Sequence, residues 1–156
     1  MVGPLEAGIA VKVYGPDWRG FIPAEAIAAT SIANERLSER YETASIVLND
    51  QWPAMRREGF MAMRLFDAVA AGGRVVSERV DGVPELFGGA AIAFDSTHHL
   101  VSVLRQDPSE LFPSELALAA ASAHVRAVHS FDARAGELVR VMTGGERHCT
   151  EGEQVS

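Results

Sequence analysis

Two loops of this chain carry the residue types that bind phosphate. The first follows the apolar segment 45–49 and contains Arg56 and Arg57 ahead of Gly59, where we expect a helix to begin. Guanidinium groups and the free backbone N–H groups of a helix start both favour an anion. Glycine also lets a ligand approach the backbone closely. This loop therefore predicts contact with a phosphate-bearing ligand.

The second loop follows the segment 74–77 and leads to Gly82, where another short helix is expected. It is also rich in charge, because it contains Glu78, Arg79 and Asp81. Two helix starts that face one crevice would present their N–H groups to a diphosphate. Glycines also begin many helices for structural reasons alone, and that simpler interpretation stays open.

Arg64 and Asp67 stand three residues apart on a helix expected over 60–71. At that spacing the two side chains share part of one helix face. The pair fits a ligand site, and it fits equally an exposed ion pair that contributes little to stability. Periodicity alone leaves both interpretations open.

The elements that must position these residues alternate along the chain. Strands are expected at 9–14, 45–49, 74–77 and 91–94. Helices are expected over 35–43 with Asn34 as N-cap, 60–71, 82–87, 97–105, 114–129 and 131–142, and a loop over 50–58. This order predicts an α/β fold, a Rossmann-like doubly wound parallel sheet that contains all four strands and has helices on both faces.

The position of the charged loops follows from that fold. Ligands of doubly wound sheets bind beyond the carboxyl ends of the strands, and both loops begin at such an end. The helix over 60–71 is expected to pack on the sheet through one apolar side, formed by Phe60, Met63, Phe66 and Ala70. Both loops and this helix are therefore expected around one crevice.

Composition excludes several classes of function. Fourteen basic and twenty-one acidic residues give a net charge of −7, and Lys12 is the only lysine. This balance argues against nucleic-acid binding and against a polybasic membrane patch. No apolar run approaches the roughly 20 residues of a membrane helix. Cys149 is the only cysteine and the histidines do not converge, so we expect no intramolecular disulfide, no metal site and a cytoplasmic location.

Four segments form a combined motif. They are residues 44–50, 56–60, 64–73 and 80–87, which read ASIVLND, RREGF, RLFDAVAAGG and VDGVPELF. Together they resemble the carboxy-terminal domain of GT-B-fold, group 1 type glycosyltransferases. The third segment is similar to the branch related to the spore-maturation glycosyltransferase-like proteins, which often read R-x-F-E/D-A-x-A-x-G. The resemblance covers about residues 8–131 and implies a nucleotide-diphosphate sugar as donor substrate, with no further cofactor.

The resemblance implies a role for each residue that matches the family motif. Asp67 matches the second of two donor-site carboxylates and would hydrogen-bond the ribose of the nucleotide. Arg64 would face the donor diphosphate as the catalytic arginine. Gly82 would approach the donor, and Glu85 would brace the loop.

The match is incomplete at the first donor-site carboxylate. That position falls on Gly59, which is not acidic, and Glu58 is one place away. A shift of one residue turns a side chain by about 100° on a helix. Arg56 and Arg57 would either reach phosphate or solvate the loop.

The expected function is that of the donor-binding half of a glycosyltransferase, which transfers a sugar from a nucleotide-diphosphate sugar to an acceptor. We expect a nucleotide-sugar-binding domain over 1–143 and a polar tail over 144–156. Residues 5–8 resemble the end of a helix, so the N-terminal strand of the domain and the acceptor domain are expected to lie ahead of Met1. A free-standing nucleotide-binding or interaction module of flavodoxin-like build stays open as the alternative.

Overall fold

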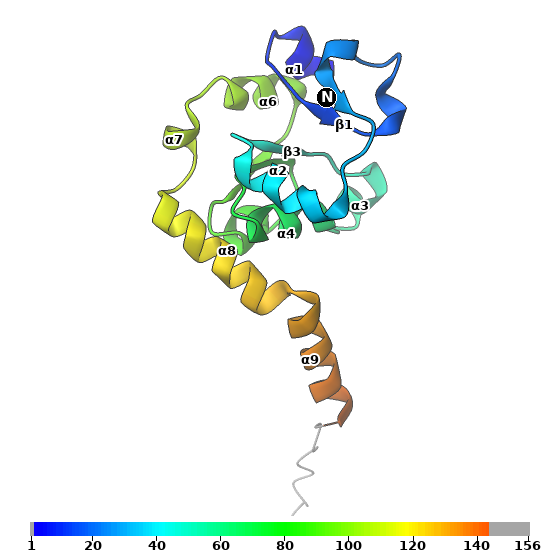
Figure 1. Cartoon of the computed structure of the whole chain (residues 1–156). Helices are drawn as coiled ribbons and strands as arrows, with labels where there is room; N and C mark the ends of the chain where they lie inside the picture. The colour runs from blue at the N-terminus through cyan, green and yellow to red at the C-terminus, as the bar shows by residue number, and fades with distance from the viewer. Residues whose placement is uncertain (1, 144–156) are drawn as a thin grey trace, which may run out of the picture.

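Three parallel strands form the main sheet at the centre of the molecule (Figure 1). The structure is a computed structural model that describes residues 2–143. The strands are β3 (Val47–Asn49), β4 (Val75–Glu78) and β5 (Ala91–Phe94), in that order. Asn49 is in register with Ser77, and all pairings are parallel, so the three carboxyl ends reach one edge of the sheet. The α/β architecture predicted from the sequence is confirmed.

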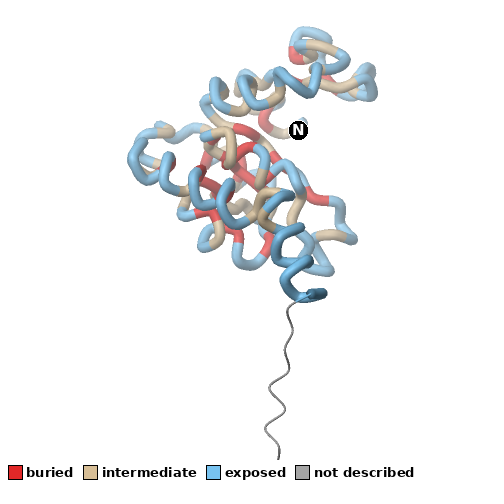
Figure 2. Tube along the Cα trace, turned by 60° about the horizontal axis from the view of Figure 1, so that its bottom comes forward, coloured by how far each residue is buried: buried red, intermediate tan, exposed pale blue. Residues whose placement is uncertain are grey.

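Helices cover both faces of this sheet. One face packs against α4 (Met63–Ala70), α5 (Val83–Leu86) and α8 (Glu115–His129), and the other against α6 (Thr97–Leu104) and α7 (Pro108–Leu111). Val75 and Val76 of β4 are both fully buried and belong to the cores on opposite faces, as the alternation of side chains along a strand requires. Figure 2 shows the buried segments gathered between these helices.

The strand expected at 9–14 does not join the main sheet, so this part of the prediction was wrong. β1 is only Val13–Tyr14 and pairs in parallel with β2 (Ile27–Ala29) in a separate two-stranded sheet. The segment between them contains the 3-10 helices η1 (Pro16–Trp18) and η2 (Ala24–Ala26). Val13 of this short segment pairs with Ile27, which is nearer along the chain than any strand of the main sheet. A separate small core forms around the pair.

The helix α1 (Val2–Glu6) packs against α6, beside the small sheet (Figure 1). Further along, the region expected as one helix over 35–43 consists of the 3-10 helix η3 (Asn34–Arg36) followed by α2 (Leu37–Thr43). Asn34 therefore lies inside η3, and its side chain caps neither helix.

Two further boundaries differ from the sequence prediction. The expected loop over 50–58 contains a helix, α3 (Pro53–Arg57), and α4 begins at Met63 rather than at residue 60. Proline suits the first turn of a helix, where its missing N–H is not needed. Gly59 then adopts a φ of 73° and Ala62 is extended, so the backbone breaks between the two helices.

The buried side of α4 is only partly the one expected. Leu65, Ala68 and Val69 are buried against the sheet, whereas Phe60 and Met63 are 64% and 47% exposed. Phe66 and Ala70 of the expected set are partly buried against the same core. Phe60 lies ahead of the helix and Met63 is its first residue, so these two do not join the packed side. The actual set keeps the i, i+3, i+4 spacing of a packed helix.

The carboxyl end of α4 is tied to α8. The carbonyl of Ala70 accepts hydrogen bonds from Ser122 Oγ at 2.7 Å and from Arg126 Nη1 at 2.6 Å. Helix ends leave carbonyl groups without intrahelical partners, and these two side chains supply them. At its other end, α8 is capped by Ser114, whose Oγ accepts a hydrogen bond from the backbone N–H of Ala117.

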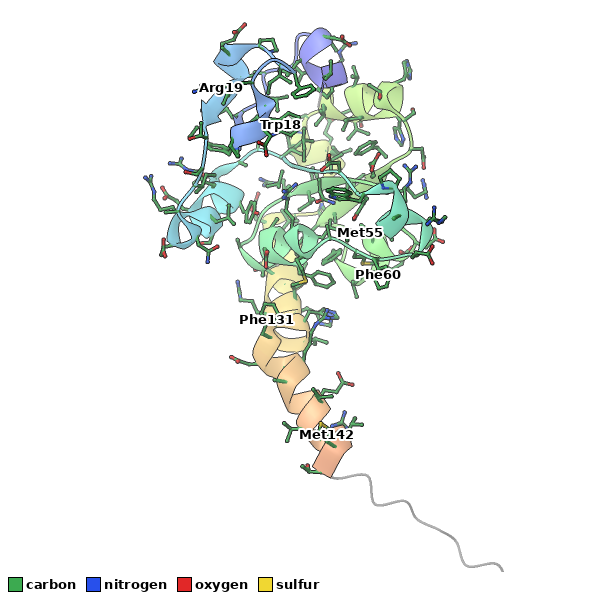
Figure 3. The ribbon with its side chains drawn as sticks, turned by 90° about the vertical axis from the view of Figure 1, so that its right-hand side faces the viewer. Trp18, Arg19, Met55, Phe60, Phe131 and Met142 are labelled. Atoms are coloured by element: carbon green, nitrogen blue, oxygen red, sulfur yellow. The ribbon has the colours of Figure 1, made fainter. Side chains whose placement is uncertain are left out.

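The last described helix, α9 (Phe131–Thr143), has no buried residue. It follows α8 and extends away from the body of the molecule, with Phe131 and Met142 along its length (Figure 3). Among residues 2–143, no helix has the length and apolar character needed to cross a membrane. The polar tail expected over 144–156 lies outside the described residues.

Candidate functional site

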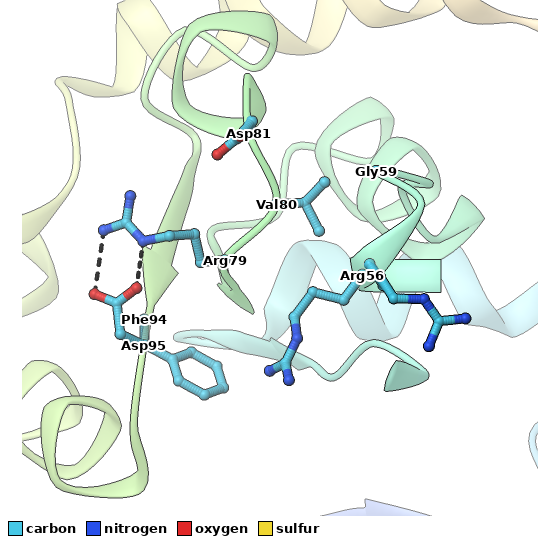
Figure 4. A pocket seen from close by; sticks show the side chains of 8 residues that line it. Arg56, Gly59, Arg79, Val80, Asp81, Phe94 and Asp95 are labelled. Carbon is cyan, nitrogen blue, oxygen red and sulfur yellow. Dashed lines mark hydrogen bonds and ion pairs between the residues drawn. The ribbon is translucent and has the colours of Figure 1, made fainter. Parts of the chain in front are cut away.

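A pocket of about 480 Å³ opens at the carboxyl ends of β4 and β5, beside the end of α3 (Figure 4). Ligands of doubly wound sheets bind at this edge. The lining is dominated by charged side chains, and its members are Arg56, Arg57, Gly59, Arg79, Val80, Asp81, Phe94 and Asp95. Three arginines from two different loops therefore meet at one opening.

The first wall of the pocket comes from α3 and the turn after it. Arg56 and Arg57 lie in the last turn of α3, and Gly59 ends that turn. Arg57 Nε donates a hydrogen bond to Glu58 Oε1 at 3.0 Å. The break at Gly59 explains why Gly59 lines the pocket without standing at the start of α4, where the sequence prediction had placed it.

Glu78, the last residue of β4, connects to this wall. Its Oε1 lies 3.5 Å from Arg56 Nη1. Its Oε2 accepts the backbone N–H of Gln51 at 2.9 Å. One carboxylate thus holds both the beginning of the loop after β3 and an arginine at its far end.

The second wall follows β4 and β5. Arg79 and Asp95 form a bidentate ion pair in which Arg79 Nη2 lies 3.2 Å from Asp95 Oδ2 (Figure 4). Hydrogen bonding to Arg79 lowers the pKa of Asp95, and the same bond raises the pKa of Arg79. The pair joins the ends of two neighbouring strands and stays charged at neutral pH.

Arg64 and Asp67 lie outside the pocket lining, in a second cluster beyond β3. Arg64 Nη1 is 3.9 Å from Asp50 Oδ1. Burial raises the pKa of Tyr41 on α2, and the positive charge of Arg64 opposes that rise, which places the two groups side by side. Burial also raises the pKa of Asp67. The two residues that the family motif assigned to ribose and diphosphate are therefore neighbours of one tyrosine.

Gly82 and Glu85 belong to α5. Gly82 is the N-cap of this helix, with a φ of 83°, and follows directly after the pocket residue Asp81. A Cβ at position 82 would lie 3.7 Å from Met61 Cε. Glu85 is exposed, and among residues 2–143 it forms no ion pair.

The comparison with protein families agrees with this geometry. A model described as glycosyl transferase-like matches residues 1–140, which is most of the chain. The chain belongs to that family. Comparisons with curated proteins and with solved structures found no match.

Family membership supports glycosyl transfer as the general activity, and the structure adds residues that the sequence prediction did not assign. Arg79 was named only as part of a charged loop, and Asp95 was not named at all. The signal for Arg79 was its place directly after a strand end. The pairing with Asp95 depends on the register of β4 and β5, which places Glu78 opposite Phe94 and brings the next residues together.

Proposed function

We propose that this chain is the donor-binding half of a glycosyltransferase that uses a nucleotide-diphosphate sugar. The observation that carries the proposal is the convergence of Arg56, Arg57 and Arg79 on one pocket at the carboxyl edge of the sheet, in a chain of the glycosyl transferase-like family. Arginine forms planar, two-point hydrogen bonds to phosphate oxygens. A diphosphate offers enough oxygens to engage guanidinium groups from both walls.

The residues assigned by the family motif complete the proposed donor site. Arg64 and Asp67 both lie outside the pocket lining, so the proposed donor extends from the pocket to α4, where Arg64 faces the diphosphate and Asp67 accepts a hydrogen bond from the ribose. The only ion pair of Arg64 among residues 2–143 is the long one to Asp50, whose side chain is 77% exposed. Such a pair is weak in water, so the guanidinium of Arg64 is available to a stronger anion. Gly82 allows close approach beside the pocket, and the family motif assigns Glu85 to the same loop.

The proposed chemistry is stabilisation of a leaving group. When the bond between the sugar and the diphosphate breaks, negative charge grows on the departing phosphate oxygen. Fixed positive groups around that oxygen lower the barrier because they need not reorganise during the reaction. Arg64 supplies this charge in the proposal, and the pocket arginines hold the rest of the diphosphate. A further domain of the parent protein would bind the acceptor.

Calorimetric titration tests the donor site. Arg64→Gln should weaken the binding of nucleoside diphosphates about 10- to 150-fold, the value of one shielded charge-assisted bond, and leave nucleoside binding unchanged. Arg64→Lys should restore only part of it if the contact is bidentate. Asp67→Asn should weaken nucleoside and nucleotide alike, because its partner is the ribose.

Arg36→Gln is the matched control. Arg36 lies on η3 with an exposed side chain, and its one ion pair among residues 2–143 is with Glu39, three residues on. The substitution removes the same charge at a site away from the pocket, so the affinities for nucleosides and nucleoside diphosphates should not change. Wild-type affinity for nucleoside diphosphates in both the Arg64 and Asp67 variants would overturn their assigned roles.

A further inference from the structure

Each arginine of the pocket is already paired with a carboxylate, and one of these carboxylates differs from the others. Arg57 pairs with its neighbour Glu58, and Arg79 pairs with Asp95. Both of those carboxylates are more than half exposed. Glu78, the partner of Arg56, is only 26% exposed and is also fixed by a backbone N–H. A carboxylate held at two points keeps its position, whereas an exposed one exchanges partners with water.

Glu78 also stands between the two walls of the pocket. The residues that directly follow it, Arg79 to Asp81, form the second wall. The residues that it contacts, Gln51 and Arg56, begin and end the segment leading to the first wall. The segment from 51 to 56 is held at both ends by one side chain. The spacing of the walls therefore depends on this carboxylate.

We propose that Glu78 is a positioning residue that holds Arg56 in place and sets the affinity of the pocket for anions. Its bond to Gln51 fixes the loop that carries Arg56, and its ion pair keeps Arg56 neutralised until an anion of higher charge replaces it. The consequence is a lower affinity of the pocket for every anion, so that a diphosphate with several contacts is held and a singly charged anion is not. This inference rests on the proposed function, because it assumes that the arginine pocket holds the donor diphosphate.

Two substitutions at position 78 separate the two parts of this role. Glu78→Gln keeps an oxygen that accepts the N–H of Gln51 and removes the charge that competes for Arg56. Inorganic pyrophosphate should then bind about three- to tenfold more tightly, the scale of one part-screened charge. Glu78→Asp keeps the charge but is one methylene shorter, so it cannot reach both partners, and pyrophosphate should bind more weakly than to the wild type.

The gain in Glu78→Gln should depend on Arg56. In an Arg56→Gln background the same substitution should no longer change the affinity, as a double-mutant cycle would show. Glu58→Gln is the matched control, since it removes one carboxylate from the same surface without touching the Gln51 contact. Titrations with inorganic pyrophosphate and with nitrate, in buffer without chloride, measure both affinities, and Glu78→Gln should raise both. Thermal melting curves establish that each variant is folded.

The outcomes distinguish this proposal from the one on which it rests. If wild-type protein binds no pyrophosphate, the proposed diphosphate site fails and the role of Glu78 fails with it. If the wild type binds pyrophosphate and both Glu78→Gln and Glu78→Asp bind it with wild-type affinity, only the role of Glu78 is overturned. An equal gain in Glu58→Gln would also overturn it, because the effect would then be general electrostatics.

Discussion

Helices α4 and α9 both contain apolar residues, but only α4 buries them. In α4, Leu65, Ala68 and Val69 are buried against the sheet, and the last carbonyl of the helix is bonded to α8. In α9 no residue is buried, and Leu138 is 60% exposed. An amphipathic pattern therefore indicates a helix in both cases but does not say whether the chain supplies a surface for it. Substitutions in α4 should therefore lower the free energy of unfolding more than substitutions in α9.

The largest difference between the two helices is expected when a leucine on each is replaced by alanine. Leu65 is completely buried, so Leu65→Ala should lower the free energy of unfolding by about 2–5 kcal/mol through lost burial and a cavity. Leu138→Ala should change it by no more than about 0.5 kcal/mol, as is usual at exposed positions. Urea denaturation followed by circular dichroism measures both. Similar losses in the two variants would show that α9 packs as α4 does.

A smaller effect is expected at the joint between α4 and α8. Arg126→Met removes the hydrogen bonds to the Ala70 carbonyl and to Ser122 while keeping the length of the side chain. The expected loss is about 1–2 kcal/mol, because Ser122 still bonds the same carbonyl. Arg140→Met on α9 removes only an exposed ion pair 3.9 Å long and should have no measurable effect. Denaturation midpoints of the two variants test this difference.

The smallest effect is a pH dependence where α4, α8 and α9 meet. His129 lies against Phe66 of α4 with ring centroids 5.3 Å apart, and Arg134 of α9 lies over the same ring. The rings of His124 and His129 lie 6.0 Å apart, so the expectation that the histidines do not converge was wrong for this pair. Burial lowers the pKa of His129, and the charges of Arg134 and His124 lower it further. The folded state thus prefers neutral His129. The stability that neutral His129 contributes to the folded state is complete above the ordinary histidine pKa of about 6.5. It is lost as the pH falls through the lower pKa of the folded state.

Denaturation at about pH 7.5 and at about pH 5 measures this contribution, since histidine changes charge between them. His129→Gln cannot take up a proton and should lose less stability on acidification than the wild type. His98→Gln, at the start of α6, is the matched control, because it makes the same substitution away from this junction. Equal losses in His129→Gln and in the wild type would remove His129 as the cause.

The sequence predicted the main sheet because its strands are short apolar segments separated by helical ones. It failed at Val13, because a two-residue strand satisfies its hydrogen bonds with any nearby partner, and Ile27–Ala29 was closer than β3. It also failed at the start of α4, where Gly59 and Phe60 looked like part of a helix. The break there depends on a local backbone conformation that periodicity does not record.

The candidate site was predictable to the extent that it depends on order along the chain. Arg56 and Arg57 follow a strand end, and the structure brings both to the pocket. The role of Arg64 in donor binding stays a prediction. Its position beside Tyr41 follows from the packing of α2 on α4, and no spacing in the sequence encodes that contact. The Arg79–Asp95 pair likewise needed the register of two strands.

The pairing of the three pocket arginines with carboxylates also bears on how quickly an anion reaches them. With Asp81, the nearby carboxylates number four against three arginines, and the whole chain carries a charge of −7. At low ionic strength, where the Debye length is about 30 Å at 0.01 M, an approaching diphosphate meets net repulsion and not attraction. At physiological ionic strength this repulsion is screened beyond about 8 Å. The arginines act only at contact. Association should therefore accelerate when salt is added, the reverse of the behaviour of an electrostatically steered site.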